Sequence, residues 1–270
     1  MSSPPPRTAV KYAYRMRRPS IVDEIVGHGA DARVALFRHD HTRVLKYCFP
    51  DDEDAVQNLE QEKNILEFLG HHPLIAHMHS VSESGLIFEY YPLGSLRDYY
   101  SKALAQPPYI HRLRWCQQVI EAVTFIHSKG VFHNDLSTRN ILLSSDMNIK
   151  ICDFGFATKQ GESMRGMAET RYNRYRSWKE LNVFVTDDLF AVGSLLFEIL
   201  TGKRPYDDIE SLDVERRFQN HVFPSLDSID PNLARIIDKC WNERYSNVKE
   251  IERDFHVEPE TIIPMATAID

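Results

Sequence analysis

The first part of the chain alternates short apolar runs with turn residues. Three runs rich in branched aliphatic and aromatic side chains lie at residues 25–26, 33–37 and 43–47, with glycine- and histidine-containing segments between them. Runs separated in this way are typical of antiparallel strands joined by tight connections. The pattern therefore predicts a small β-meander over residues 21–47.

A helix with a carboxylate on its apolar face is predicted next. The acidic stretch 51–54 suits the positive end of a helix dipole, and Gly70 is a typical helix terminator. The apolar positions at helical spacing are Val56, Leu59, Leu66 and Leu69. Glu62 lies on the same stripe. A carboxylate that points into a core is costly without a partner, so we expect a cation beside it.

The remainder of the chain changes from strand patterns to helical periodicity. One more strand is expected at residues 86–88. Helices are expected over residues 110–130 and 186–202, the second capped by Thr186. A strand-rich beginning followed by a helix-rich remainder favours an α+β architecture. We expect two lobes: a small β-rich N-terminal lobe with one key helix, and a larger α-helical C-terminal lobe.

Composition narrows the class of protein. The chain has 270 residues, of which 43% are hydrophobic and 26% are charged, as in a soluble globular protein. Its formal net charge of −7 gives no general attraction to nucleic acid or anionic lipid. The longest apolar run, residues 189–200, contains Glu198 and is too short to cross a bilayer. We therefore expect no nucleic-acid partner and no membrane association.

The cysteines, histidines and N-terminus indicate neither a metal centre nor secretion. The four scattered cysteines include no Cys-x-x-Cys pair, which favours free thiols in the cytoplasm or nucleus. The basic, proline-rich N-terminus lacks the apolar stretch of a secretory signal. Four histidines have no carboxylate or cysteine at zinc spacing, and we interpret them as part of a loop that flanks a strand: His71, His72, His77 and His79.

An acidic loop precedes a predicted β-hairpin in the middle of the chain. The apolar runs 141–143 and 149–151 flank a polar turn. Antiparallel pairing would bring Asn140, before the first strand, next to Asp153, after the second. An amide oxygen and a carboxylate together can bind a hard cation such as Mg²⁺. Asp135 lies in the preceding loop, near enough to accept a proton from an attacking hydroxyl.

Two motifs in this region resemble the protein kinase family. His133-Asn134-Asp135…Asn140 stands where the family has its His-Arg-Asp…Asn catalytic loop, and Asp153-Phe154-Gly155 matches its Asp-Phe-Gly motif. The resemblance covers roughly residues 20–252, with the motifs in the family's order. It implies the two-lobed kinase fold, transfer of the γ-phosphate of ATP to a protein hydroxyl, and a requirement for Mg²⁺.

The resemblance also implies roles for individual side chains. Lys46 matches the lysine that holds the ATP phosphates, and it is the cation expected beside Glu62. Asp188 resembles the aspartate that anchors the catalytic loop. The catalytic residues implied are Asp135, Lys46 and Asn140, with Mg²⁺ held by Asn140 and Asp153. The ATP contacts implied are Ile25, Val26, Gly27, Gly29, Val34, Lys46, Glu62, Glu89 and Tyr91.

Two departures from the family pattern concern the nucleotide loop and regulation. Ala32 replaces the third glycine of the loop, a small change. Asn134 replaces the arginine that usually receives a phosphate on the activation segment. We therefore predict activity without phosphorylation of Ser163, Thr170 or Tyr172.

A third departure concerns the end of the activation segment. The family's Ala-Pro-Glu motif is absent near residues 175–177. The usual partner of that glutamate is an arginine, which we match to Arg244. Arg244 is expected to be unpaired or to pair with Glu180, so the attachment of the substrate-binding segment is open at this point.

Two signals for the acceptor hydroxyl conflict. Arg139, with no lysine two residues after Asp135, resembles the tyrosine-kinase loop. Thr170 resembles the threonine that contacts the catalytic aspartate in serine/threonine kinases. We favour serine/threonine specificity. The alternatives are a tyrosine or dual-specificity kinase, an ATP-binding pseudokinase scaffold, and a small-molecule kinase of related fold.

The resemblance also sets the expected domain boundaries. Residues 1–20 are expected to form a flexible basic tail, residues 21–255 the kinase domain and residues 256–270 a C-terminal tail. Within the domain, the N-terminal lobe is expected at residues 21–90 and the C-terminal lobe at residues 91–255. We expect a monomer that acts on a protein substrate.

Overall fold

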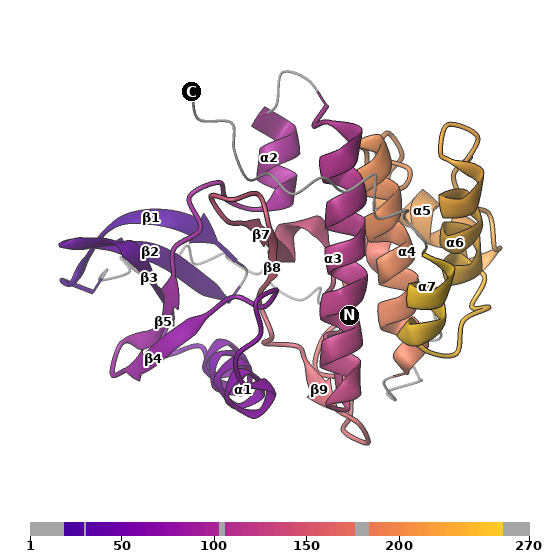
Figure 1. Ribbon diagram of the computed structural model, residues 1–270. Helices are drawn as coiled ribbons and strands as arrows, with labels where there is room; N and C mark the ends of the chain where they lie inside the picture. The colour runs from indigo at the N-terminus through magenta and orange to yellow at the C-terminus, as the bar shows by residue number, and fades with distance from the viewer. Residues whose placement is uncertain (1–18, 30, 103–105, 176–183, 256–270) are drawn as a thin grey trace, which may run out of the picture.

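The computed structural model describes residues 19–29, 31–102, 106–175 and 184–255, and within them the chain forms two lobes (Figure 1). The N-terminal lobe is a five-stranded antiparallel sheet with one long helix beside it. The C-terminal lobe is mainly helical. The two-lobed α+β architecture expected from the sequence is confirmed.

The N-terminal sheet has the strand order β1-β2-β3-β5-β4. Its strands are β1 (Val22–His28), β2 (Ala32–Phe37), β3 (Asp40–Cys48), β4 (Met78–Ser82) and β5 (Gly85–Glu89). The first three form the predicted meander. Val34 pairs with Lys46, so both side chains lie on the same face of the sheet. The opposite face carries a small separate core that consists of Val22, Ala35, Leu45 and Tyr47.

Helix α1 (Glu53–Leu69) begins and ends where its sequence predicts. The Asp52 side chain accepts a hydrogen bond from the N–H of Ala55 (3.0 Å), and Gly70 ends the helix with a φ of 72°. Its buried residues are Ala55, Glu62, Ile65, Leu66 and Leu69. Val56 was expected on this stripe but is 41% exposed, because the buried stripe starts one residue earlier, at Ala55.

The C-terminal lobe is built around helix α4 (Val185–Thr201), in which every residue from Asp188 to Leu200 is buried. The expected cap is wrong, since the Asp187 carboxylate, and not Thr186, accepts the N–H of Phe184 (3.0 Å). The other helices are α2 (Leu96–Lys102), α3 (Tyr109–Ser128), α5 (Ser211–Gln219), α6 (Pro231–Trp241) and α7 (Val248–Asp254). A β-carbon at Gly193 would lie 2.6 Å from Cβ of Cys240, so glycine allows α4 and α6 to pack closely.

Short elements lie between α3 and α4 in the chain. Strand β6 (Val131–Phe132) pairs with β9 (Thr158–Lys159), and β7 (Ile141–Leu143) pairs with β8 (Ile149–Ile151) as the predicted hairpin. Two 3₁₀ turns, η1 (Thr138–Asn140) and η2 (Thr170–Tyr172), lie in the catalytic loop and the activation segment.

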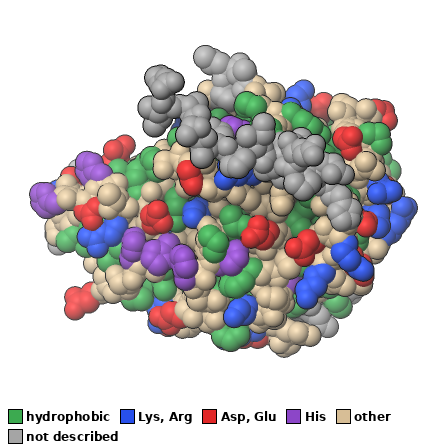
Figure 2. Space-filling model, viewed as in Figure 1, with side chains coloured by type: hydrophobic (Ala, Val, Ile, Leu, Met, Phe, Trp, Pro, Cys, Tyr) green, Lys and Arg blue, Asp and Glu red, His purple; other side chains and the backbone are tan. Residues whose placement is uncertain are grey.

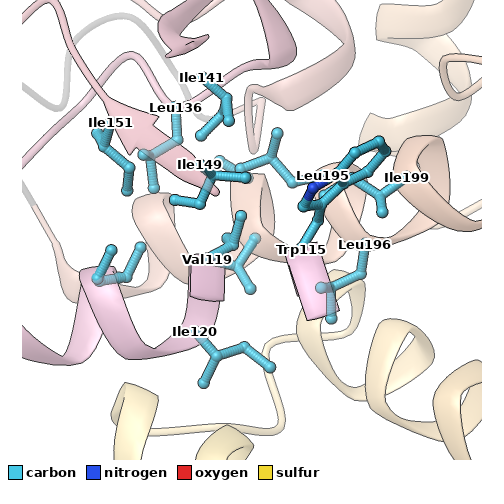
Figure 3. Packing of buried hydrophobic residues seen from close by; sticks show 14 of the residues in the cluster. Trp115, Val119, Ile120, Leu136, Ile141, Ile149, Ile151, Leu195, Leu196 and Ile199 are labelled. Atoms are coloured by element: carbon cyan, nitrogen blue, oxygen red, sulfur yellow. The ribbon is translucent and has the colours of Figure 1, made fainter. Parts of the chain in front are cut away.

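The hairpin rests on the main core of the C-terminal lobe. Figure 3 shows residues of α3 and α4 packed beside those of β7 and β8, among them Val119, Leu195, Ile141 and Ile149. Each of these four side chains is fully buried. The indole of Trp115 donates to the carbonyl of Met147 in the hairpin turn (2.8 Å). The loop between β6 and β7 is therefore supported by a rigid, close-packed base.

Histidine side chains gather on one face of the N-terminal lobe (Figure 2). Ring contacts join His71 to His77 (5.4 Å between centroids) and His77 to His79 (4.6 Å). Across the described ranges, no group of three or more histidine, cysteine, aspartate or glutamate side chains is arranged to hold a metal ion. No helix in those ranges is both long and apolar enough to span a membrane.

Candidate active site

Lys46 on β3 lies at the centre of a charge cluster between the lobes. Its ammonium is 2.5 Å from Oε2 of Glu62 on α1 and 2.9 Å from Oδ1 of Asp153. The Glu62 side chain is 2% exposed, so the cation predicted beside it is present. Burial would lower the pKa of Lys46, but Asp153 and Glu62 together raise it above its ordinary value. The lysine therefore keeps its charge.

Helix α1 also contacts the backbone that follows Asp153. Oε1 of Glu62 accepts a hydrogen bond from the N–H of Phe154 (3.3 Å), and Gln61 donates to the carbonyl of Ala157 (2.8 Å). The rings of Phe154 and His133 are in contact, with centroids 4.7 Å apart. These contacts fix the start of the activation segment relative to the helix.

The nucleotide loop, residues 27–34, covers the end of β1, the start of β2 and the connection between them. The N–H of Gly29 donates to the carbonyl of Ala32 (2.9 Å), which closes the described part of the turn. Asn58 of α1 donates to Asp31 of the loop (2.8 Å). This second bond was not predicted, because a polar residue on a helix surface has no periodic signal for a distant partner.

The expected ATP contacts on β1 and β2 lie on different faces of the sheet. Gly27 pairs with Val34, and Val34 shares the face of Lys46. Ile25 instead pairs with Ala35 and packs on the separate core of the opposite face. The expectation is wrong for Ile25, because a register shift between Ile25 and Gly27 breaks the regular alternation and turns Ile25 away from Lys46. Val26 is 36% exposed.

The segment 89–91, which we call the hinge, includes two of the expected ATP contacts and leaves one backbone donor free in the described chain. The N–H of Glu89 donates to the carbonyl of His77 (3.0 Å), and that of Tyr90 donates to Thr42 (2.8 Å). In the part of the chain that the structure describes, the N–H of Tyr91 has no acceptor. The Tyr91 hydroxyl donates to the Glu89 carboxylate (3.0 Å), which orients both residues.

Asp188 of α4 anchors the catalytic loop, as the sequence suggested. Its carboxylate accepts the backbone N–H groups of His133 (2.8 Å) and Asn134 (2.9 Å). The His127 ring donates to the same carboxylate (2.9 Å). Asn134 has a φ of 63°, a left-handed conformation that asparagine tolerates. Because Asp188 is 1% exposed on a tightly packed helix, the loop backbone has a fixed support.

Asp135 and Asn140 are joined within the catalytic loop. The Asn140 amide nitrogen donates to Oδ2 of Asp135 (2.9 Å) and to its carbonyl (2.8 Å). The carbonyl of Asn140 accepts the N–H of Cys152 (3.0 Å), which brings Asn140 beside the strand that leads to Asp153. Burial, with a contribution from Asp153, raises the pKa of Asp135 to about 7. Such a carboxylate suits a proton acceptor near neutral pH.

An ion pair attaches the end of the activation segment to the C-terminal lobe, and its two charges are exchanged relative to the family pattern. Arg174, in the segment, forms an ion pair with Glu243, just after α6. Arg244 pairs instead with Asp238 (3.0 Å). The expectation that Arg244 is unpaired or depends on Glu180 is therefore corrected, and Glu180 itself lies outside the described residues. The segment supplies the cation here, and the C-terminal lobe supplies the carboxylate.

The three activation-segment hydroxyls have different environments. Tyr172 is fully buried, and its hydroxyl donates to Glu198. Thr170 begins the 3₁₀ turn η2, and within the described residues no hydrogen bond joins its side chain to Asp135, so the contact expected from the resemblance is not formed here. Ser163 is exposed and lines a cavity of about 690 Å³ between α1 and the activation segment.

The sequence of this chain is similar to those of known protein kinases. The model of the protein tyrosine and serine/threonine kinase family matches residues 22–253. The chain is 26% identical over 231 residues to a probable serine/threonine-protein kinase PknB of Lactococcus lactis, and 30% identical over 196 residues to MAP3K epsilon protein kinase 2 of Arabidopsis thaliana. These matches cover 78% and 70% of this chain, but only 36% and 14% of the two relatives. The chain belongs to the protein tyrosine and serine/threonine kinase family.

Proposed function

We propose that this chain transfers the γ-phosphoryl group of Mg-ATP to a serine or threonine hydroxyl of a protein substrate. The observation that carries the proposal is the convergence of Lys46, Glu62 and Asp153 in one charge cluster, with the joined pair Asp135 and Asn140 in the adjacent loop. Phosphoryl transfer depends mainly on positioning and on neutralising phosphate charge, and this arrangement supplies both. The names of both relatives given above are those of protein kinases, and one is named a serine/threonine kinase.

The side chains present fit a magnesium ion. Mg²⁺ prefers oxygen ligands such as carboxylates and side-chain amides. The amide nitrogen of Asn140 is committed to Asp135, which leaves its oxygen for a cation. Asp153 binds Lys46 through one oxygen, and its side chain is 44% exposed. Asn140 and Asp153 would hold the ion, which when bound neutralises the phosphate oxygens.

The remaining steps use groups of the chain itself. The charged Lys46 would bind phosphate oxygens, and Glu62 keeps it in place. The free N–H of Tyr91 would bind adenine at the hinge. Asp135 would orient the attacking hydroxyl and accept its proton, a role that its raised pKa supports.

We also propose that residues 21–255 form the catalytic domain, with its lobes meeting near residues 90 and 91, and that it acts as a monomer in the cytoplasm or nucleus. The free cysteines Cys48, Cys116, Cys152 and Cys240 support a reducing compartment. Light scattering of the purified chain tests the monomer, and fractionation of its native cells tests the compartment.

The main test compares the wild-type chain with Asp135→Asn. Each protein is incubated with labelled Mg-ATP and a mixed peptide library, followed by phospho-amino-acid analysis. We expect label on serine or threonine, reduced roughly 10²- to 10⁴-fold in the variant, with ATP affinity unchanged because Asp135 acts on the acceptor hydroxyl. Label on tyrosine would favour a tyrosine kinase. Stabilisation by ATP without any transfer would indicate an ATP-binding scaffold.

A further inference from the structure

Glu169 of the activation segment is a carboxylate on which three arginines converge. Its Oε2 lies 2.7 Å from Arg97 of α2 and 3.3 Å from Arg139 of the catalytic loop. Its Oε1 lies 3.4 Å from Arg204, which follows α4. The Glu169 side chain is 18% exposed, so solvent screens these pairs less than it would on an open surface. A single side chain thus connects the activation segment to three parts of the C-terminal lobe.

Arg139 is the arginine nearest to the proposed chemistry. Besides Glu169, its guanidinium lies 3.9 Å from Oδ1 of Asp135. The Arg139 side chain is 52% exposed, so it has room to change its rotamer. A guanidinium forms its strongest hydrogen bonds with carboxylates. If Glu169 lost its charge, the nearest carboxylate available to Arg139 would be that of Asp135.

Arg97 links the same cluster to the two 3₁₀ turns. It donates to the hydroxyl of Thr138 in η1 (3.1 Å) and to that of Tyr172 in η2 (3.1 Å). Both hydroxyls also donate to the buried carboxylate of Glu198. The ion pairs of Glu169 are therefore continuous with the hydrogen bonds that join the catalytic loop to the η2 end of the activation segment.

We propose that Glu169 is a positioning residue that keeps Arg139 from pairing closely with Asp135 and holds the end of the activation segment on the C-terminal lobe without a phosphate. The inference rests on the proposed function, in which Asp135 must stay available to the acceptor hydroxyl. Without the Glu169 charge, the three guanidiniums would repel one another, and the most exposed of them would turn toward Asp135.

The first test is steady-state kinetics of Glu169→Gln, which keeps the shape of the side chain but removes its charge. The matched control is Glu162→Gln, since Glu162 is in the same segment and accepts the backbone N–H of Lys159. We expect kcat/KM for peptide to fall about tenfold in Glu169→Gln, as for loss of one charge-assisted bond, with KM for ATP unchanged. The control should match the wild type.

A second substitution separates positioning from simple support of the fold. Adding Arg139→Gln to Glu169→Gln should restore most of the lost turnover, because the guanidinium that lies near Asp135 is then absent. If Glu169 only supported the fold, the double variant would be weaker than either single one. That result, or a Glu169→Gln protein as active as the wild type, would overturn the inference.

Hydrogen exchange gives a readout that does not need turnover. In Glu169→Gln, amides of residues 164–175 should exchange about tenfold faster than in the wild type and in Glu162→Gln, while those of β5 should not change. Faster exchange together with an inactive wild type would leave the positioning role standing and refute the proposed function. Unchanged exchange would overturn the role of Glu169 whether or not the wild type transfers phosphate.

Discussion

The side-chain amide of Asn134 donates a hydrogen bond to the hydroxyl of Thr158, 2.9 Å away. The same amide donates to the carbonyl of Phe156 (2.9 Å), so the catalytic loop is joined directly to the segment that leads into β9. Where the family has an arginine that receives a phosphate, this chain has a neutral side chain that already contacts the segment. This attachment supports the prediction of activity without phosphorylation.

Replacing Asn134 by alanine should destabilise the fold. The variant loses both hydrogen bonds and places alanine, which tolerates the left-handed region less well than asparagine, at a φ of 63°. We expect the free energy of unfolding to fall by about 2 kcal/mol, measured by urea denaturation. Asn134→Gly separates the two causes, since glycine accepts this φ and should lose less. A loss below ~0.5 kcal/mol in Asn134→Ala would show that the amide contributes little.

A phosphate at Ser163 should hinder activity. The cavity beside Ser163 is also lined by Asp31, Asp54 and Glu162, with Arg165 as the one cation among its lining residues. Added negative charge therefore meets mainly carboxylates. We expect Ser163→Glu to lower kcat/KM about two- to fivefold, and Ser163→Ala to match the wild type. The difference should shrink at high salt, because these groups are near solvent. Higher activity in Ser163→Glu would refute this assignment.

Reversing the charge of Arg174 or of Glu243 should detach the end of the activation segment. Either single change places two like charges at a contact that is now an ion pair, beside Asp187, whose Oδ1 is 3.3 Å from Arg174. We expect each of Arg174→Glu and Glu243→Arg to lower stability by about 1 kcal/mol. The double reversal should recover part of this loss, measured as a coupling energy in a double-mutant cycle. Strictly additive losses would mean that the two side chains do not interact.

The pH dependence of stability should reveal the raised pKa of Asp135. That pKa is about 7 in the folded protein against an ordinary value of 3.8, so the folded state binds the proton more tightly than the unfolded state. The resulting stabilisation is complete below pH 3.8 and is lost as the pH rises through about 7. In magnesium-free buffer, Asp135→Asn should therefore be more stable than the wild type at pH 8, by on the order of 3 kcal/mol.

The same comparison at low pH provides the control. Near pH 4 the wild-type carboxyl is protonated and resembles the neutral asparagine, so the difference in urea denaturation should nearly vanish. Other titrating groups are common to both proteins and cancel in the comparison. A difference that is equal at pH 5 and pH 8 would show that Asp135 does not titrate with a raised pKa.

Some parts of the site can be predicted from short stretches of sequence, because neighbouring residues alone determine them. A carboxylate on an apolar helix stripe needs a cation, and this requirement agrees with the pairing of Glu62 with Lys46 that the family resemblance implies. The β7–β8 hairpin likewise requires only two apolar runs and a turn. Ile25 was misplaced because its face depends on a register shift between β1 and β2, which no periodicity reports.

Polar contacts between residues far apart in the chain could not be predicted from the sequence either. Arg97 and Glu169 are 72 residues apart, and Glu169 precedes a short 3₁₀ turn, where no repeating pattern marks a partner. The pair of Arg174 with Glu243 was missed for a further reason. The family pattern has a glutamate in the activation segment and an arginine in the C-terminal lobe. In this chain the arginine is in the segment and the glutamate is in the lobe.

The charge cluster at Lys46 draws its members from both lobes, whereas Asp135 and Asn140 belong to the C-terminal lobe alone. Rotation of one lobe against the other would separate Lys46 from Asp153 without disturbing the bond between Asp135 and Asn140. If the proposed roles hold, rotation of the lobes would leave the proton acceptor intact and would disrupt the cluster proposed to bind phosphate. On that proposal, a ligand or partner that changes the angle between the lobes would alter nucleotide binding without disturbing the bond between Asp135 and Asn140.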